Sequence, residues 1–178
     1  LSAGRETAGA TLGLIGFGSI GQRTGQLAHR LGMAVIAYDP ALPDSHPAWM
    51  DVGAIRVDLH ALISTADVVS LHVPLVDATR NLFDATRINQ MKPGAVLINT
   101  SRGGIVDEAA LVAALRSGRL GGAAIDVFTL EPLPASAMFA DCPNLILTPH
   151  IAGVTAEANV RVSSMIAEAV INAMRPER

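Results

Sequence analysis

A glycine-rich turn between an aliphatic run and a helical pattern constrains this fold more than any other feature. Residues 11–21 read TLGLIGFGSIG, in which aliphatic residues lead directly into Gly16, Gly18 and Gly21. This order predicts a buried strand, a tight turn and a helix. In such a unit Gly16 permits the turn, Gly18 lets the backbone approach a pyrophosphate, and Gly21 lets the helix pack on the strand. The spacing therefore indicates a dinucleotide site at the start of the helix.

A second strand ends in an acidic residue at the place that such sites use. Residues 33–38 (MAVIAY) read as a buried strand, and Asp39 follows Gly21 at about the expected 20-residue spacing. A carboxylate there hydrogen-bonds ribose hydroxyls and repels a 2′-phosphate. No lysine or arginine lies between Gly32 and Gly53 to receive such a phosphate. The pattern favours NAD over NADP, while the alternative that Asp39-Pro40 simply ends a strand stays open.

Strand and helix patterns alternate along the rest of the chain. Further strands are predicted at residues 67–72, 95–99, 121–127 and 144–148. Helices are predicted at residues 19–32, 58–66, 84–91, 107–118 and 155–174. We therefore predict an α/β fold of the Rossmann type, a doubly wound parallel sheet between two helical layers.

The predicted domain occupies residues 11–175, and the polar residues 1–10 read as a linker. The first helix carries Ile20, Leu27 and Leu31 at helical spacing, and the last helix has an apolar face. That face holds Val160, Ala167, Ile171 and Met174. Residues 40–50 follow no recognisable pattern.

The composition narrows the classes of partner. Half of the residues are hydrophobic but only 3% are aromatic, which suits strands buried on both faces by aliphatic side chains. A net charge of −3 gives no basic footprint, so no nucleic-acid or membrane partner is expected. The single cysteine, Cys142, excludes an internal disulfide, and with no membrane-length apolar run the expected location is cytoplasmic. No metal site is expected.

Titratable side chains recur where predicted strands end. They are Asp39, His72, Arg102, Asp126, Glu131 and His150. Each alone has an ordinary explanation, such as a loop salt bridge for Arg102 or a capping role for His150. Because parallel strands present their carboxyl ends at one edge, where ligands bind, the shared location predicts an active site.

Four further segments are recognisable. Residues 96–108 (VLINTSRGGIVDE), 124–132 (AIDVFTLEP) and 145–153 (LILTPHIAG) resemble signatures of the D-isomer specific 2-hydroxyacid dehydrogenases, and residues 71–82 (LHVPLVDATRNL) fit the same family. The resemblance covers essentially the whole chain. It points to the NAD-binding domain, in the neighbourhood of phosphoglycerate dehydrogenase and hydroxypyruvate or glyoxylate reductases.

The resemblance implies an NAD-dependent oxidoreductase that transfers a hydride between the nicotinamide and a D-2-hydroxy acid or its 2-keto partner. It implies that His150 is the catalytic acid–base, that Glu131 is its carboxylate partner, and that Arg102 binds the substrate. These roles suit the side chains. Histidine titrates near neutral pH, a carboxylate orients it, and a guanidinium fork grips a carboxylate.

The resemblance also implies the contacts to NAD. Ser19 and Ile20 would offer backbone amides to the pyrophosphate, Asp39 would bind the ribose, and Asp126 would hold the nicotinamide carboxamide. The family commonly has a basic residue where Ser19 stands, so one phosphate contact is expected to be missing. The remaining expected cofactor-binding residues are Gly16, Gly18, Gly21, His72, Val73, Pro74, Thr79, Thr100, Ser101, Arg102, His150 and Gly153.

The resemblance implies a second domain that binds substrate, and we expect that domain to be absent from this chain. We therefore expect the chain alone to bind NAD but to be inactive. We also expect it either to expose an apolar face on its last helix or to pair as a homodimer through this domain. An NAD(H)-sensing corepressor-like protein of the same fold is the alternative, because it can retain the same three catalytic-type residues. An S-adenosylmethionine methyltransferase shares the glycine turn but gives no account of Arg102, Glu131 and His150.

Overall fold

The computed structural model describes residues 4, 6–134 and 138–174. Residues 1–3 and 5 of the predicted linker, and residue 175 at the predicted domain end, lie outside this range. The strands are β1 (Thr11–Ile15), β2 (Ala34–Tyr38), β3 (Ile55–Arg56), β4 (Val68–Leu71), β5 (Val96–Asn99), β6 (Gly122–Ile125) and β7 (Leu145–Leu147). The helices are α1 (Ser19–Arg30), α2 (Ala48–Val52), α3 (Leu59–Thr65), α4 (Ala85–Gln90), α5 (Glu108–Arg116) and α6 (Ala156–Ala173).

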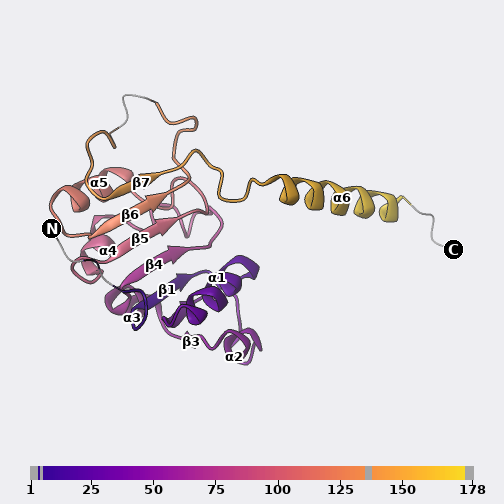
Figure 1. Ribbon diagram of the computed structural model, residues 1–178, viewed down its shortest axis with the longest axis horizontal. Helices are drawn as coiled ribbons and strands as arrows, with labels where there is room; N and C mark the ends of the chain where they lie inside the picture. Colours follow the sequence, from indigo (N-terminus) through magenta and orange to yellow (C-terminus); the bar gives the residue numbers. More distant parts are fainter. Residues whose placement is uncertain (1–3, 5, 135–137, 175–178) are drawn as a thin grey trace.

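All of these strands form one parallel sheet in the order β3-β2-β1-β4-β5-β6-β7 (Figure 1). The strand order reverses between β1 and β4. Such folds bind ligands in the crevice at the carboxyl ends of the two strands where the order reverses. The predicted α/β class and doubly wound parallel sheet are confirmed. The sequence patterns missed β3 because it has two exposed residues, and they missed α2, which begins directly after Pro47.

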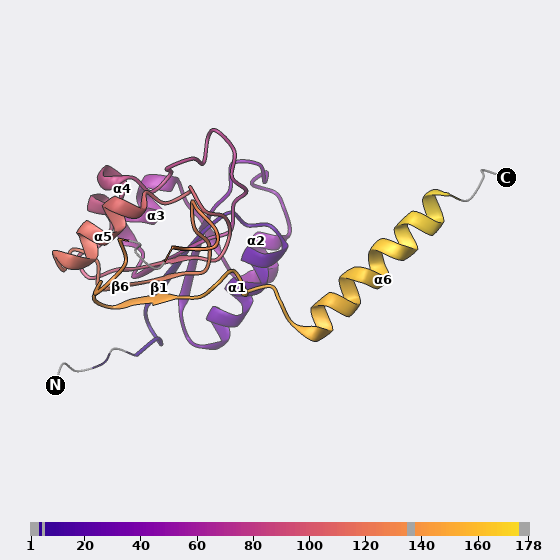
Figure 2. The ribbon, with the colours of Figure 1, turned by 90° about the horizontal axis from the view of Figure 1, so that it is seen from above.

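Two apolar clusters place helices on both faces of the sheet. In one, α3, α4 and α5 contribute Leu62, Ile88 and Leu111, which pack with strand residues such as Leu97. Figure 2 shows these three helices together on one side. In the other cluster, α1 and α2 cover Leu14 and its neighbours in β1 and β2. Burial of aliphatic side chains on both faces explains why the strands read as continuous apolar runs.

Helix α1 packs on the sheet through small residues. Its buried residues are Gly21, Gly25 and Ala28, and a Cβ added to Gly25 would lie 2.8 Å from a methyl of Val52. Its large apolar residues face away from the core: the exposed fractions of Ile20, Leu27 and Leu31 are 68%, 50% and 62%. The helical spacing of these three residues was therefore real, but it marks the outer face of α1.

Three aspartates cap the helices on the other face. The carboxylates of Asp58, Asp84 and Asp107 accept hydrogen bonds from amides in the first turns of α3, α4 and α5. Such caps satisfy amides that have no acceptor within the helix.

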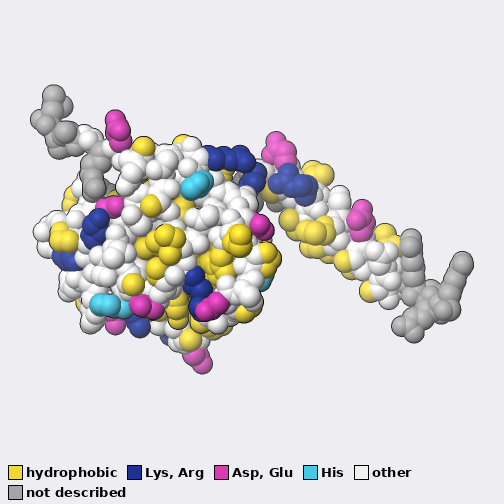
Figure 3. Space-filling model, turned by 90° about the horizontal axis from the view of Figure 1, so that it is seen from below, with side chains coloured by type: hydrophobic (Ala, Val, Ile, Leu, Met, Phe, Trp, Pro, Cys, Tyr) yellow, Lys and Arg dark blue, Asp and Glu magenta, His cyan; other side chains and the backbone are white. Residues whose placement is uncertain are grey.

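Helix α6 extends away from the sheet (Figures 1 and 2). None of its residues is buried, and apolar side chains are exposed along its length, as Figure 3 shows. The expected apolar face on the last helix is thus exposed. Among the described residues, no helix combines the length and apolar character needed to cross a lipid bilayer.

Candidate cofactor and catalytic site

The glycine turn after β1 is sterically tight on one side and open on the other. Gly16 has φ of +90°, and a Cβ built on it would lie 2.4 Å from the carbonyl oxygen of His72. A Cβ on Gly21 would lie 2.3 Å from the carbonyl oxygen of Gly16. Gly18, in contrast, has no atom within 4 Å of its Cβ position. Gly16 and Gly21 therefore leave no room for a side chain. The open surface at Gly18 fits the close approach of a pyrophosphate.

The start of α1 offers free amides at this turn. Gly18 is the N-cap residue and supplies no capping side chain, and the first turn contains no acidic residue. The backbone amides of Ser19 and Ile20 have no acceptor within the helix. Both residues are exposed. This end of the helix therefore carries unpaired donors and the positive end of the helix dipole, which suit an anion.

Asp39 connects the end of β2 to the glycine turn. Its Oδ2 accepts a hydrogen bond from the amide of Phe17 over 2.8 Å, and its Oδ1 accepts one from the amide of Ala41 over 2.9 Å. A carboxylate has about four acceptor sites, so each oxygen keeps one for a ribose hydroxyl. The strand-ending function and the ribose function are therefore compatible in this geometry.

The loop after β4 lies against the same turn. A methyl of Val73 would lie 2.9 Å from a Cβ on Gly16. The Nε2 of His72 lies 3.0 Å from the hydroxyl of the buried Ser70, and burial lowers the pKa of His72 below its ordinary value. The hydroxyl of Thr79 donates to the carbonyl of Pro74 over 2.6 Å. Internal hydrogen bonds thus hold this loop beside the turn.

Asn99, at the end of β5, organises the next loop. This buried side chain accepts hydrogen bonds from the amide and hydroxyl of Ser101, over 3.1 and 2.7 Å, and donates to the carbonyl of Arg102 over 3.0 Å. Thr100 is exposed. Asn99 was not among the predicted site residues, although a polar residue that ends a buried strand is a signal for such a role.

The loop that carries Arg102 packs against the loop after β6. A Cβ on Gly103 would lie 1.8 Å from the carbonyl oxygen of Phe128, so the two backbones touch. The Arg102 side chain is exposed and donates to the carbonyl of Ser101 over 2.6 Å. Among the described residues no hydrogen bond joins it to Glu131 or His150. Its guanidinium is therefore available on the same side of the sheet.

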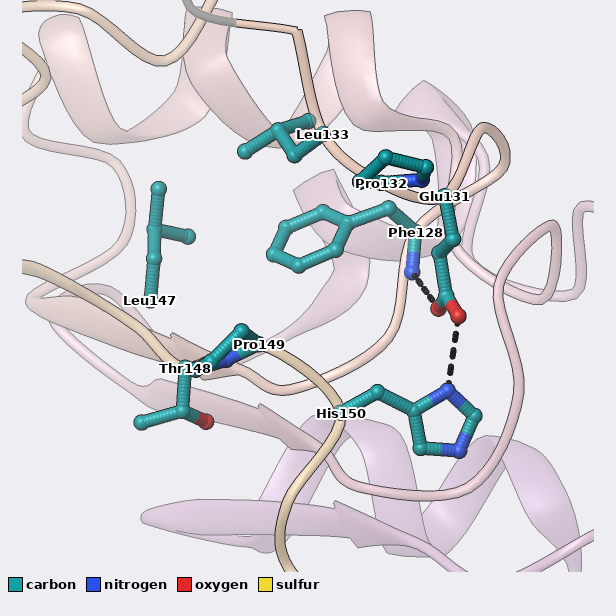
Figure 4. Close-up of a pocket in the computed structure, with 8 residues that line it drawn as sticks. All are labelled: Phe128, Glu131, Pro132, Leu133, Leu147, Thr148, Pro149 and His150. Carbon is teal, nitrogen blue, oxygen red and sulfur yellow. Dashed lines mark hydrogen bonds and ion pairs between the residues drawn. The ribbon is translucent and has the colours of Figure 1, made fainter.

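Glu131 and His150 form a hydrogen-bonded pair at this edge (Figure 4). The Nδ1 of His150 lies 2.7 Å from Oε2 of Glu131, whose Oε1 accepts the amide of Phe128 over 2.8 Å. The hydrogen bond with His150, and then that from Phe128, lower the pKa of Glu131. The other imidazole nitrogen points away from Glu131 in Figure 4. The pair therefore presents one imidazole nitrogen for proton exchange while the carboxylate fixes the other.

Asp126 holds the backbone that carries His150. Its buried carboxylate accepts hydrogen bonds from the hydroxyl of Thr148 over 2.6 Å and from the amides of Ile151 and Ala152 over 2.9 Å each. Burial alone would raise the pKa of Asp126, but these hydrogen bonds lower it below its ordinary value. The structure thus gives Asp126 a role in shaping the turn at residues 148–152.

A largely apolar cavity of about 590 Å³ opens beside the Glu131–His150 pair (Figure 4). Its lining residues are Phe128, Glu131, Pro132, Leu133, Leu147, Thr148, Pro149 and His150. Gly153 follows the histidine turn, with open space around its Cβ position. In the described part of the chain, no group of three or more histidine, cysteine, aspartate or glutamate side chains is arranged to hold a metal ion.

The predicted residues therefore gather into two neighbouring groups at one edge of the sheet. The first surrounds the glycine turn at the ends of β1, β2 and β4, and the second surrounds Glu131 and His150 at the ends of β5, β6 and β7. The first group has the open backbone, free amides and carboxylate that a dinucleotide needs. The second has the hydrogen-bonded Glu131–His150 pair.

Known proteins resemble this chain in sequence. Residues 2–152 match the family model of the D-isomer specific 2-hydroxyacid dehydrogenase NAD binding domain. The chain is 51% identical to an (S)-sulfolactate dehydrogenase of Chromohalobacter salexigens, over 96% of this chain and 55% of that protein. It is 42% identical to a hydroxypyruvate reductase of Thermotoga maritima, over 94% of this chain and 54% of that protein.

A solved structure has a similar fold. A glyoxylate reductase from Paecilomyes thermophila superposes with a TM-score of 0.87 at 33% identity, covering 97% of this chain and 51% of that one. The chain spans about half the length of these relatives. Because the family model matches most of the chain, the chain belongs to the D-isomer specific 2-hydroxyacid dehydrogenase family, as an NAD-binding domain.

Proposed function

We propose that the full-length protein is an NAD-dependent dehydrogenase that interconverts a D-2-hydroxy acid and its 2-keto acid. The observation that carries this proposal is the 2.7 Å pair between Glu131 and His150, at the same sheet edge as the glycine turn. The dehydrogenases and reductases among the chain's relatives support it.

In this proposal His150 is the catalytic acid–base. Its Nε2 donates a proton to the oxygen of a 2-keto acid and takes it back in the reverse direction. Glu131 holds Nδ1 and stabilises the imidazolium, as its lowered pKa indicates that it stays ionised. The exposed guanidinium of Arg102 binds the substrate carboxylate and polarises the carbonyl. When bound, NADH would supply the hydride.

The cofactor-binding residues are proposed on the same basis. The amides of Ser19 and Ile20, with the open backbone at Gly18, would hold the pyrophosphate, and Asp39 would bind the ribose hydroxyls. Asp126 would hold the carboxamide in addition to shaping the histidine turn. The lining residues would be His72, Val73, Pro74, Thr79, Thr100, Ser101, Arg102, His150 and Gly153.

The substrate proposed first is a short 2-hydroxy acid with a second polar or anionic group. Support comes from the relatives named for sulfolactate and hydroxypyruvate, of which the first is 51% identical to this chain. Sulfopyruvate, hydroxypyruvate, phosphohydroxypyruvate and glyoxylate are the compounds to compare.

The organisation of the whole protein is also a proposal. We infer that residues 11–175 form the NAD-binding domain, with residues 1–10 as a linker to a substrate domain. The exposed apolar face of α6 would suit contact with such a domain or with a partner subunit, and a homodimer through this domain is proposed. A cytoplasmic location is proposed because the chain has a single cysteine, which is free.

The decisive experiment follows NADH oxidation by the full-length protein against these keto acids, with NADPH and His150→Ala as controls. The proposal expects NADH-specific turnover of one acid that is lost in His150→Ala. Tight NADH binding with no turnover of any acid would favour the corepressor-like alternative.

A further inference from the structure

The segment that the sequence patterns left unexplained brings the chain's single tryptophan onto the glycine turn. Trp49, in α2, stacks on Phe17 with ring centroids 4.6 Å apart and planes inclined by 6°. Both rings are buried, and the indole nitrogen donates to the carbonyl of Pro43 over 3.0 Å. Phe17 is the residue between Gly16 and Gly18. A ring from outside the turn is therefore fixed against the residue at its centre.

Phe17 is held at three points. Its amide donates to Asp39 over 2.8 Å, its carbonyl accepts from the side chain of Gln22 over 2.8 Å, and its ring lies on Trp49. These contacts join the carboxylate after β2, the first turns of α1 and helix α2. Phe17 thus connects the groups assigned above to the ribose and to the pyrophosphate.

The glycines on either side of Phe17 give this connection its importance. Glycine restricts the backbone less than any other residue, so a free G-x-G turn would sample many conformations. Ordering such a turn when a ligand binds costs affinity, and a contact that orders it beforehand removes that cost. The Trp49–Phe17 stack is buried and independent of any ligand contact, so it is suited to this task.

We propose that Trp49 and Phe17 are a positioning pair that holds the glycine turn in its NAD-binding geometry and sets the spacing between Asp39 and the first amides of α1. The inference rests on the proposed roles of the turn and of Asp39. It assigns a function to residues 40–50: they present Trp49 to the turn. The pair lies with the first group of residues, away from His150, so it governs NAD affinity and leaves the proton-transfer machinery unaffected.

The test compares Trp49→Ala, Trp49→Phe and Leu111→Ala in the full-length protein. Leu111 is fully buried in the other apolar cluster, so its truncation destabilises the fold without touching the turn. Calorimetry should show the Kd for NADH raised about tenfold by Trp49→Ala, and by less than about threefold by Trp49→Phe, which keeps a stacked ring. Leu111→Ala should leave the Kd for NADH within about twofold of the wild-type value.

A second readout needs no ligand. Hydrogen exchange at the amide of Phe17, which is buried and bonded to Asp39, should be faster in ligand-free Trp49→Ala than in ligand-free Leu111→Ala. In steady-state assays Trp49→Ala should raise the KM for NADH with kcat retained. If Trp49→Ala does not fold, Phe17→Leu replaces it, since this variant keeps apolar volume and loses the stack.

The outcomes separate the two proposals. Wild-type protein that does not bind NADH would overturn the proposed function. Wild-type binding together with unchanged affinity and exchange in Trp49→Ala, or equal losses in Trp49→Ala and Leu111→Ala, would overturn the positioning role alone. If Trp49→Phe raised the Kd for NADH as much as Trp49→Ala does, ring stacking would be excluded as the cause of the positioning effect.

Discussion

The backbone amide of His150 donates a hydrogen bond to the backbone carbonyl of Asp126 over 2.8 Å, which continues the pairing of β6 and β7 beyond the last strand residue. His150 has φ of +55°, a conformation that non-glycine residues seldom adopt. The Asp126 carboxylate stabilises it by accepting the amides of Ile151 and Ala152. The position of the His150 backbone is therefore determined by the end of the sheet, and Glu131 holds the imidazole that it carries.

Asp126→Asn should loosen this turn, because an amide has one acceptor oxygen where the carboxylate uses two. We expect kcat to fall by about 10- to 100-fold, the loss typical of residues that orient a reacting group. Hydrogen exchange at Ile151 and Ala152 should accelerate in parallel. Thr148→Val, which removes only the hydroxyl donor, is the matched control with a smaller effect. Native exchange and native kcat in Asp126→Asn would contradict the role in shaping the turn.

His150→Ala should abolish proton transfer while leaving the glycine turn intact. We expect kcat to fall by about 10²- to 10⁴-fold, the usual contribution of a general acid–base. The Kd for NADH, measured by calorimetry, should stay within about threefold of wild type. Unchanged turnover would remove His150 from the mechanism.

Glu131→Gln should lower the rate by weakening the contact that orients the imidazole. The lowered pKa of Glu131 arises first from its hydrogen bond with His150, so the ionised carboxylate is the form that makes this contact. We expect kcat to fall by about 10- to 100-fold, the loss typical of residues that orient a reacting group. Glu108→Gln is the control, because Glu108 accepts the Thr129 amide over 2.6 Å in the same region without contacting His150. A kcat for Glu131→Gln equal to that of wild type would refute the orienting role.

Asp39→Asn should weaken the preference for NADH over NADPH. The neutral side chain still has an oxygen to accept the Phe17 amide, but it no longer repels a 2′-phosphate. We expect the ratio of kcat/KM values for the two cofactors to fall by about tenfold or more. An unchanged ratio would leave Asp39 with its strand-ending role alone.

His72 should contribute to the pH dependence of stability. Its pKa in the folded state is lowered by burial from 6.5, so the unfolded chain binds more protons just below that pH. The contribution of His72 to the free energy of unfolding is therefore fully present above about pH 6.5. It is lost as the pH falls toward the folded-state pKa, by at most about 1.4 kcal/mol per pH unit for one proton. Urea titrations at several pH values should show a shallower loss in His72→Gln. If His72→Gln lost stability with pH as wild type does, the pH dependence of stability would arise from other groups.

The residues at strand ends could be predicted because their positions follow from one rule. Parallel strands deliver their carboxyl ends to one edge, so Asp39, Arg102 and His150 were expected together from their place after predicted strands. The structure puts their loops at that edge, and it shows the Glu131–His150 contact directly.

What the patterns missed depends on contacts between distant segments. The stripe of Ile20, Leu27 and Leu31 has the spacing of a buried face, yet α1 packs through Gly21 and Gly25, whose small size allows the close approach. Periodicity cannot distinguish these cases, since both faces repeat at 3.6 residues. The bonds from Asp126 to residues 148–152 likewise join loops that are separate in sequence.

Helix α6 has no buried residue, and within the described part of the chain only its own backbone hydrogen bonds and capping by Thr155 hold it together. Most helices in proteins gain their stability from packing an apolar face, and isolated helices have little of their own. The chain should therefore contain two cooperative units of very different strength, divided near residue 155. In native-state hydrogen exchange of this chain, the amides of α6 should equilibrate with solvent long before those of β1, β4 and β5.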